Sequence, residues 1–295
     1  MKKDLRVILK GGLGNQLLQY YAGLELSQYL DRQLVIDTSW FKRNVHSNGL
    51  LDQREFLLNQ YKFSENINII DKMNWKNSPL TERMIRKIPH RISNFIGFYP
   101  EMTQADYVIR TQKEIVIFGH WVNKPVLPTR DILRVHLVKN ILNPSPSYSS
   151  LQKKVQQTNI ISVHHRLGDY KNFGLQYGVI DEEYFAKAVR FLKRNLNSER
   201  QEVWLFSDEP ELSLRMLSSK IEISQVISKH HKISESETIS LISQSAGIVG
   251  SNSTFSWWAG LLSDDLKTSV IFPKDYMRDV ETKQTGLYID GWHYL

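Results

Sequence analysis

Residues 5–37 read LRVILKGGLGNQLLQYYAGLELSQYLDRQLVID, and this stretch decides the fold class. The apolar run 5–9 predicts a short buried strand, and the glycine-rich turn 11–14 follows it. Beyond the turn, apolar residues recur at helical spacing over 17–24, and residues 33–37 predict a second strand. A strand, a glycine turn, a helix and a strand in this order indicate a βαβ unit of an open α/β sheet.

Alternating strand and helix patterns continue along the rest of the chain. Residues 114–118 predict a strand and residues 129–139 a helix, and the Pro- and Ser-rich stretch 143–147 is the best linker candidate. Further elements are predicted beyond it: strands at 159–163, 202–206, 247–250 and 269–273, and helices at about 181–195, 210–218, 237–244 and 255–262. Together they predict two doubly wound, Rossmann-like α/β domains, residues 1–147 and residues 148–295, as the length of 295 residues allows.

The composition excludes several classes of protein. With 41% hydrophobic and 23% charged residues, the chain is neither disordered nor a fibrous repeat. It has no cysteine, which excludes disulfides, zinc–thiolate sites, thiol nucleophiles and iron–sulfur clusters. Neither a run of 18 apolar residues nor a signal-peptide pattern occurs, so a cytoplasmic protein is expected.

The charge favours anionic partners, with a formal net charge of +7 and a pI near 9.3. Residues 1–150 carry 21 Lys and Arg against 13 Asp and Glu, whereas the remaining residues carry 17 against 18. Residues 83–98 mix basic and apolar side chains, which fits either contact with a membrane surface or a helix packed on its own domain. Nucleic acid is not expected as a partner, because no stripe of basic and aromatic residues is present to stack bases.

Four polar clusters come directly after predicted strands, where open α/β sheets bind ligands. The first cluster, residues 11–16, places glycine amides at the start of a helix, which favours an anion. The alternative interpretation is a tight turn that binds no ligand. The second offers the Arg166 guanidinium to phosphate oxygens, with Asp169 placed to hold it; a purely structural Arg–Asp pair is the alternative. The adjacent His164 and His165 are expected on opposite faces of the strand, where either can be a buried core residue instead.

The third cluster, residues 206–209, offers the Asp208 carboxylate to a nucleobase or a ribose, unless Ser207 or Asp208 only caps the next helix. The fourth, residues 250–258, places small hydroxyl residues at another helix start, where they bind an anion or simply cap the helix. Its two adjacent tryptophans are expected in the core. A glycine turn, an arginine loop and a hydroxyl-rich helix start together suggest a bound diphosphate.

Five segments, which fall in order over most of the chain, resemble a known family. They are GGLGNQLLQYYAGLELS (11–27), FGHWVN (118–123), HHRLGDY (164–170), SDE (207–209) and SNSTFSWWAGLL (251–262). In these segments the chain resembles the α-1,2-fucosyltransferases of glycosyltransferase family 11, of bacterial type. Two positions depart from the family pattern: Leu167 stands where a second arginine is usual, and His165 replaces a more common apolar residue.

The resemblance implies a GT-B fold, in which two Rossmann-like domains face each other across a cleft. The first domain would lie on the acceptor side and the second would bind the GDP-sugar, with the C-terminal tail able to pack back on the first. It also implies inverting transfer of L-fucose from GDP-β-L-fucose without a metal or another cofactor. The implied acceptor is the 2-hydroxyl of a β-galactoside in O-antigen or another surface polysaccharide. A lipid-linked acceptor would bring the protein into peripheral contact with the inner face of the cell membrane.

The resemblance also carries roles over to single residues. Arg166 would contact the β-phosphate, and His164 and Asp208 would lie near the guanine and the ribose. The expected donor-binding residues are Gly12, Gly14, Asn15, Gln16, His164, Arg166, Asp208, Asn252, Ser253 and Thr254. The expected catalytic residues are Arg166, Asp169 and His165, and the expected acceptor-side residues are Asp37, His120 and Trp121. The catalytic base stays open among Asp37, His165 and Asp169, and no residue is assigned to a metal.

Two other functions remain open at this point. Leu167 leaves room for a glycosyltransferase that uses another nucleotide sugar. A non-catalytic carbohydrate-binding protein would bind glycan without releasing GDP from a donor. A nicotinamide-dependent oxidoreductase is disfavoured, because the glycine turn does not have the GxGxxG spacing.

Overall fold

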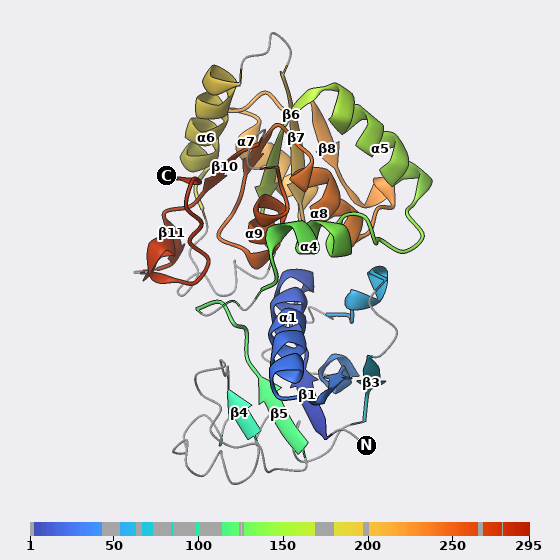
Figure 1. The fold of residues 1–295 in the computed structure, drawn as a ribbon. Coiled ribbons are helices and arrows are strands. Elements are labelled where there is room, and N and C mark those ends of the chain that lie inside the picture. The colour runs from blue at the N-terminus through green and yellow to red at the C-terminus, as the bar shows by residue number, and fades with distance from the viewer. Residues whose placement is uncertain are drawn as a thin grey trace. The chain divides into compact units, whose positions relative to one another are not determined.

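Figure 1 shows the fold in the computed structural model, which describes residues 3–42, 54–62, 67–72, 84, 98–100, 114–123, 125, 127–168, 180–196, 201–264, 268–278 and 280–295. The chain divides into two compact units, Met1–Thr129 and Arg130–Leu295. Most of the basic and apolar segment 83–98 lies outside the described residues.

The first unit is built on a parallel sheet of five strands. Its elements are β1 (Asp4–Ile8), α1 (Leu13–Tyr29), β2 (Gln33–Asp37), 3-10 turns at Ser39–Lys42 and Leu58–Gln60, β3 (Asn68–Ile70), β4 (Phe98–Pro100) and β5 (Glu114–Phe118). The strand order is β3-β2-β1-β5-β4, and every neighbouring pair is parallel. The two strands predicted from residues 5–37 are confirmed to within a residue at each end. The helix between them is also confirmed, but it is longer than the predicted spacing and begins at Leu13, inside the glycine turn.

The second unit contains a parallel sheet of six strands in the order β13-β10-β9-β6-β7-β8. Its strands are β6 (Asn159–His165), β7 (Gln201–Ser207), β8 (Gln225–Ile227), β9 (Gly247–Val249), β10 (Ser269–Phe272) and β13 (His293–Tyr294). Its helices are α4 (Arg130–Leu137), α5 (Pro146–Gln157), α6 (Glu182–Asn195), α7 (Pro210–Leu217), α8 (Glu235–Ser243) and α9 (Thr254–Leu261), with a 3-10 turn at Lys229–His231.

Helices cover both faces of the second sheet. On one face, Phe185 and Leu192 of α6 and Leu217 of α7 pack on Ile161 and Val163 of β6 in a buried apolar cluster. The alternate residues of β6 face the other helices: Ser162 bonds Ser245 just after α8, and His164 bonds Ser256 of α9. The second unit is therefore doubly wound, as the sequence predicts.

The Pro- and Ser-rich segment 143–147 starts a helix instead of ending a domain. Ser145 caps α5 by accepting a hydrogen bond from the Tyr148 amide, and Pro146 is the first helical residue. The Ser145 amide also donates to Glu237 of α8, at 2.5 Å. The segment therefore belongs to the second unit, which begins at Arg130. A serine at the N-cap followed by a proline is a signal for the start of a helix. Linkers are rich in the same two residue types, so the sequence alone did not separate the two possibilities.

The C-terminal tail adds to the second unit. After β11 (Asp275–Met277) and β12 (Val280–Glu281), which pair antiparallel, and a 3-10 turn at Thr282–Gln284, the chain returns as β13 beside β10. The Leu295 amide then donates to the Phe272 carbonyl. These pairings make the tail the edge of the second sheet.

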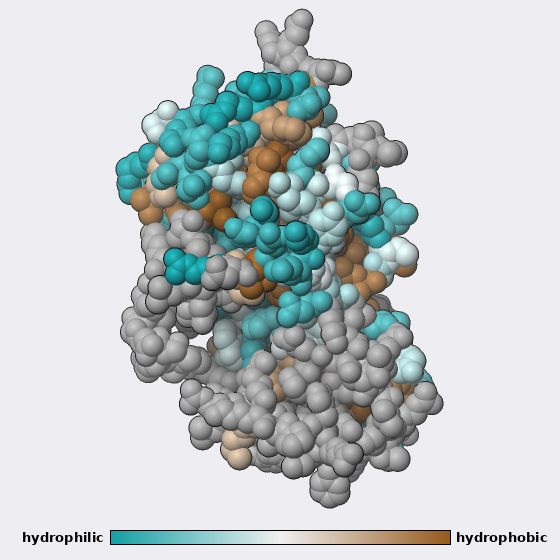
Figure 2. All heavy atoms as spheres, turned by 90° about the vertical axis from the view of Figure 1, so that its left-hand side faces the viewer, coloured by the Kyte–Doolittle hydropathy of each residue, from teal (hydrophilic) through white to brown (hydrophobic). Residues whose placement is uncertain are grey.

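The surface of the second unit in Figure 2 is largely hydrophilic, with smaller hydrophobic areas between the polar side chains. On α6, which faces the viewer there, the exposed residues are Lys187, Arg190, Lys193, Arg194 and Asn195. Within the described ranges, no helix is both long and apolar enough to span a membrane.

Candidate active site

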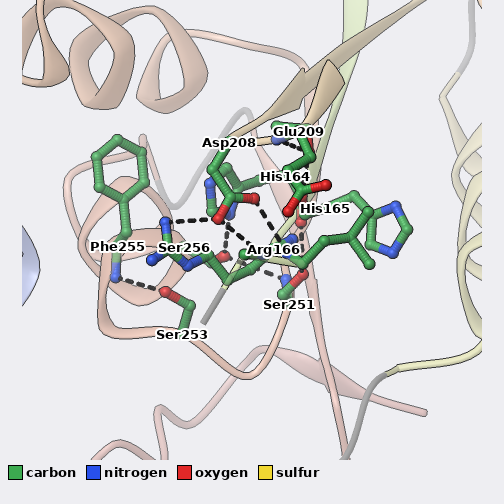
Figure 3. Close-up of polar contacts among 12 residues, drawn as sticks. His164, His165, Arg166, Asp208, Glu209, Ser251, Ser253, Phe255 and Ser256 are labelled. Carbon is green, nitrogen blue, oxygen red and sulfur yellow. Dashed lines mark hydrogen bonds and ion pairs between the residues drawn. The ribbon is translucent and has the colours of Figure 1, made fainter. Parts of the chain in front are cut away.

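The candidate site lies where three neighbouring strands of the second sheet end. The strands β9, β6 and β7 are adjacent and parallel, so their carboxyl ends share one edge of the sheet. The loops that leave this edge carry Arg166, Asp208 and Ser251 (Figure 3). The second, third and fourth sequence clusters are thus brought together at the edge where open α/β sheets bind ligands.

Asp208 organises the loop that follows β6. Its carboxylate lies 2.9 Å from Arg166 Nη1 and accepts hydrogen bonds from the amides of Leu167 (3.0 Å) and Gly168 (2.9 Å). A Cβ at residue 168 would lie 2.5 Å from Asp208 Oδ2, so only glycine permits this approach. The Arg166 and Asp208 side chains are 18% and 22% exposed, which leaves the pair within reach of a ligand.

The charge state of Asp208 follows from these contacts. Burial acts to raise the pKa of this carboxyl, but the Arg166 guanidinium and the two backbone amides outweigh it, so the pKa lies below its usual value. The carboxylate is therefore ionised at neutral pH. The sequence assigns this contact with Arg166 to Asp169, which lies outside the described residues, and places Asp208 beside the nucleoside.

Two serines fasten the loop between β9 and α9 to the end of β6. Ser251 Oγ accepts from the Arg166 amide (2.9 Å) and donates to the His164 carbonyl (2.8 Å). Ser256 Oγ accepts from the Ser251 amide (3.1 Å) and bonds His164 Nδ1 (2.6 Å). Neither serine was among the predicted site residues, although both lie in the fourth cluster. The signal that could have identified them is a hydroxyl side chain close to the end of a predicted strand.

The two histidines of β6 lie on opposite faces of the sheet, as strand alternation predicts. His164 faces α9 and stacks on Phe255, with ring centroids 4.9 Å apart. His165 faces the other helices: its Nδ1 lies 2.7 Å from Ser213 Oγ, and its ring packs on Phe185. His165 is fully buried, and its Nε2 has no hydrogen-bond partner among the described residues.

Burial disfavours the charged form of both imidazoles, and it lowers the pKa of His164 to about 3 and that of His165 to about 4. Unfolding restores ordinary pKa values near 6.5, so below that pH the unfolded chain takes up protons that the folded protein does not. The free energy of unfolding should therefore fall by up to about 1.4 kcal/mol per pH unit for each histidine between about pH 6 and pH 4. Urea denaturation at steps from pH 7 to pH 5 measures this slope.

Asp208 does not contribute over the range from pH 7 to pH 5, because its lowered pKa makes its own contribution fall only near pH 4 and below. His165→Asn removes one of the two groups and should reduce the slope. A wild-type stability that stays flat over this range would contradict the buried neutral state of both rings.

The start of α9 is capped by its own side chain. Ser253 is the N-cap and its Oγ accepts from the Phe255 amide, so the capping role is confirmed, and Thr254 begins the helix. Asn252 Nδ2 donates to the Tyr276 carbonyl. Both tryptophans of α9 are buried, which confirms their expected place in the core.

The start of α7 differs from the sequence expectation. Glu209 is the N-cap of α7, and it forms no side-chain capping bond. Ser207 Oγ accepts from the Glu209 amide and donates to the His165 carbonyl. Neither Ser207 nor Asp208 is therefore the cap, because Asp208 turns its carboxylate toward the loop after β6.

The glycine turn of the first unit forms the N-terminus of α1. Gly12 is the N-cap, and its carbonyl accepts from the Asn15 and Gln16 amides. Gly14 is buried in the first turn of the helix and Asn15 is half-buried. Gln16 is fully buried, and its amide group bonds only backbone in the contacts described: the Gly11 and Glu55 carbonyls and the Leu57 amide.

The three acceptor-side residues have different surroundings. Asp37 is fully buried, accepts bonds from Arg6 Nε (2.8 Å) and Nη2 (2.5 Å), and also accepts from the Ser39 amide. His120 is exposed just beyond β5, and Trp121 is fully buried. In the described parts of the chain, no group of three or more His, Asp or Glu side chains is arranged to hold a metal ion.

Comparison with known proteins shows which family this chain belongs to. The sequence profile of "Glycosyl transferase family 11" matches residues 122–295. O-antigen biosynthesis glycosyltransferase WbnK of Escherichia coli is 23% identical over 96% of this chain and 98% of its own length. An alpha-1,2-colitosyltransferase, also of Escherichia coli, is 23% identical over 87% of this chain and 86% of its own length.

Solved structures show the same fold. Fucosyltransferase NodZ from Bradyrhizobium superposes with a TM-score of 0.55, at 15% identity, over 89% of this chain and 94% of that chain. NodZ soaked with GDP-fucose gives a TM-score of 0.52, at 14% identity, over 89% of this chain and 93% of that chain. The two parallel-sheet units and this likeness identify a GT-B fold. Because the family profile covers more than half of its residues, the chain belongs to glycosyl transferase family 11 and is a glycosyltransferase.

Proposed function

We propose that the protein transfers L-fucose from GDP-β-L-fucose, with inversion, to the 2-hydroxyl of a β-galactoside. The observation that carries the proposal is the Arg166 guanidinium, held by Asp208 where β6, β7 and β9 end. The relatives support the finer assignment: one is named for O-antigen biosynthesis and the other for α-1,2 transfer, and NodZ was soaked with GDP-fucose. The proposed product is an O-antigen or another surface polysaccharide.

The chemistry requires positive charge beside the diphosphate. As the bond between fucose and phosphate breaks, the sugar becomes oxocarbenium-like and the leaving GDP gains negative charge. A fixed cation aimed at that charge stabilises the transition state more than the ground state. A guanidinium has five N–H donors, so Arg166 can contact Asp208 and a phosphate oxygen together.

The acceptor hydroxyl attacks from the face opposite to the diphosphate, which inverts the configuration at the fucose carbon. The proposed donor-binding residues of the second unit are His164, Arg166, Asn252, Ser253 and Thr254, with Asp208 orienting Arg166. Gly12, Gly14 and Asn15 are proposed for the first unit, and Gln16 supports their turn through its backbone contacts. The proposal needs neither a metal nor a cofactor, because Arg166 and the backbone amides at the start of α9 supply the positive field.

The proton of the acceptor hydroxyl needs a destination. Asp169 remains the proposed base, from the loop that carries Arg166. Asp37 and His165 are left out of the proposal because both are fully buried, one against Arg6 and the other against Phe185. The proposed acceptor is a free or lipid-linked oligosaccharide, and the lipid-linked form would place the reaction at the cytoplasmic face of the membrane.

Incubation with GDP-fucose and a panel of β-galactosides, with and without EDTA, tests the proposal. We expect an α-1,2-fucosylated product by NMR, release of one GDP per fucose transferred, and no loss of rate with EDTA. GDP-mannose, UDP-galactose and a colitosyl donor are the matched competitors. Faster transfer from one of them would favour another nucleotide sugar. Binding of a galactoside without GDP release from any donor would favour a non-catalytic carbohydrate-binding protein.

A further inference from the structure

The first sheet reverses its strand order beside β1. From β1 the chain moves to β2 and β3 on one side, whereas β4 and β5 lie on the other side. The neighbouring strands β1 and β5 are parallel, so the segments that follow them leave the same edge of the sheet, the edge at which α/β proteins bind ligands. The glycine turn follows β1, and Gly119-His120-Trp121 follows β5.

The turn after β5 has an unusual backbone. Gly119 has a φ of 140° and Trp121 a φ of 53°, in the left-handed region that bulky residues rarely adopt. The Trp121 side chain is fully buried, which anchors the turn, and the intervening His120 is exposed. The strained turn therefore displays one imidazole at the carboxyl end of the sheet, and strain of this kind clusters at functional sites.

One buried side chain joins the two turns. Gln19 of α1 is fully buried, its Nε2 donates to the Gly119 carbonyl (2.8 Å), and its Oε1 accepts from the Lys10 amide (2.8 Å). The contact spans 100 residues of sequence and fixes the turn after β5 to the residue that precedes the glycine turn. Only a side chain that donates at one end and accepts at the other can make both bonds.

We propose that Gln19 is a positioning residue for acceptor recognition: it holds Gly119 so that His120 contacts a hydroxyl of the acceptor sugar at the carboxyl ends of β1 and β5. The inference rests on the proposed function. It assigns the acceptor to this edge of the first sheet because the proposed phosphate contacts, those of Arg166 and α9, belong to the second unit. An imidazole suits the task, since its two nitrogens donate and accept hydrogen bonds with hydroxyl groups.

Gln19→Glu tests the inference, because it keeps the shape and the bond from Lys10 but places a carboxylate against the Gly119 carbonyl. We expect the KM for the acceptor to rise by about tenfold, the loss expected for one such hydrogen bond. The KM for GDP-fucose and the affinity for GDP should not change. Gln28→Glu is the matched control, because it makes the same chemical change at an exposed residue of the same helix.

His120→Ala is the second variant, and as a change at an exposed residue it should leave folding intact. It should raise the acceptor KM as Gln19→Glu does, and the double variant should lose no more than either single variant, because both remove one contact. Equal losses in kcat and in both KM values, or additive losses in the double variant, would overturn the inference.

Hydrogen exchange of the peptide that contains His120 reports on the anchoring without any substrate. Exchange should be faster in Gln19→Glu than in Gln28→Glu, and equal exchange would overturn the positioning role. If exchange is faster in Gln19→Glu than in Gln28→Glu but the wild-type protein does not transfer fucose, the proposed function is overturned instead. The two failures are therefore distinguishable.

Discussion

Replacing Arg166 with alanine is expected to lower the rate of fucose transfer by about 10²–10³-fold in a protein that still folds. The Arg166 guanidinium, 2.9 Å from Asp208, is the fixed positive charge proposed for the departing diphosphate. Alanine removes this charge where the transition state gains negative charge, so kcat should fall more than the affinity for the donor. Steady-state kinetics with GDP-fucose and the best acceptor of the panel measures the effect.

The matched control is Arg190→Ala. Arg190 lies on α6 in the same unit and pairs with Glu183 at the surface, so its loss should leave transfer at the wild-type rate. Arg166→Lys keeps the charge without the planar fork and should give an intermediate rate. Near-normal transfer by a folded Arg166→Ala protein would exclude Arg166 from the reaction.

Replacing Asp37 with asparagine is expected to lower the free energy of unfolding by about 3–5 kcal/mol. Asp37 is fully buried and Arg6 is 3% exposed, so the substitution leaves a buried guanidinium without its main counter-charge. Glu114, 3.6 Å from Arg6 Nη1, compensates in part. Chemical denaturation of both proteins at one pH measures the difference.

Asp71→Asn is the control for this prediction. Asp71 pairs with Lys42 on the surface of the same unit, and an exposed pair contributes little to stability. A different result for Asp37→Asn would change the assignment of Asp37. If that protein keeps wild-type stability and yet loses transfer, Asp37 acts on the acceptor, the role that the sequence analysis expected for it.

The sequence was sufficient for the alternation of strands and helices, because apolar periodicity and glycine turns are local signals. It was not sufficient for α5, whose start at Ser145 and Pro146 has the composition of a linker. The strands β11, β12 and β13 have two or three residues each, too few for alternation to show. The strands β11 and β12 pair with each other, and β13 forms only where the chain returns beside β10.

The edge of the candidate site was predictable, because parallel strands place their carboxyl ends together. The partner of Arg166 was not, since it depends on strand register. His165 pairs with Ser207 between β6 and β7, and this pairing sets the next residues, Arg166 and Asp208, opposite each other. Nearness in sequence pointed to Asp169 instead. For the same reason the role of Gln19, which contacts a residue 100 positions away, could not be predicted.

The described residues that follow β6, β7 and β9 are held to one another by hydrogen bonds of Asp208, Ser251 and Ser256. Their conformational entropy is therefore lost when the protein folds and not when a nucleotide arrives. A diphosphate that meets these residues need not order them, so more of its binding energy remains to distort the sugar toward the transition state. Preorganisation of this kind links the folding of the second unit directly to the speed of the reaction.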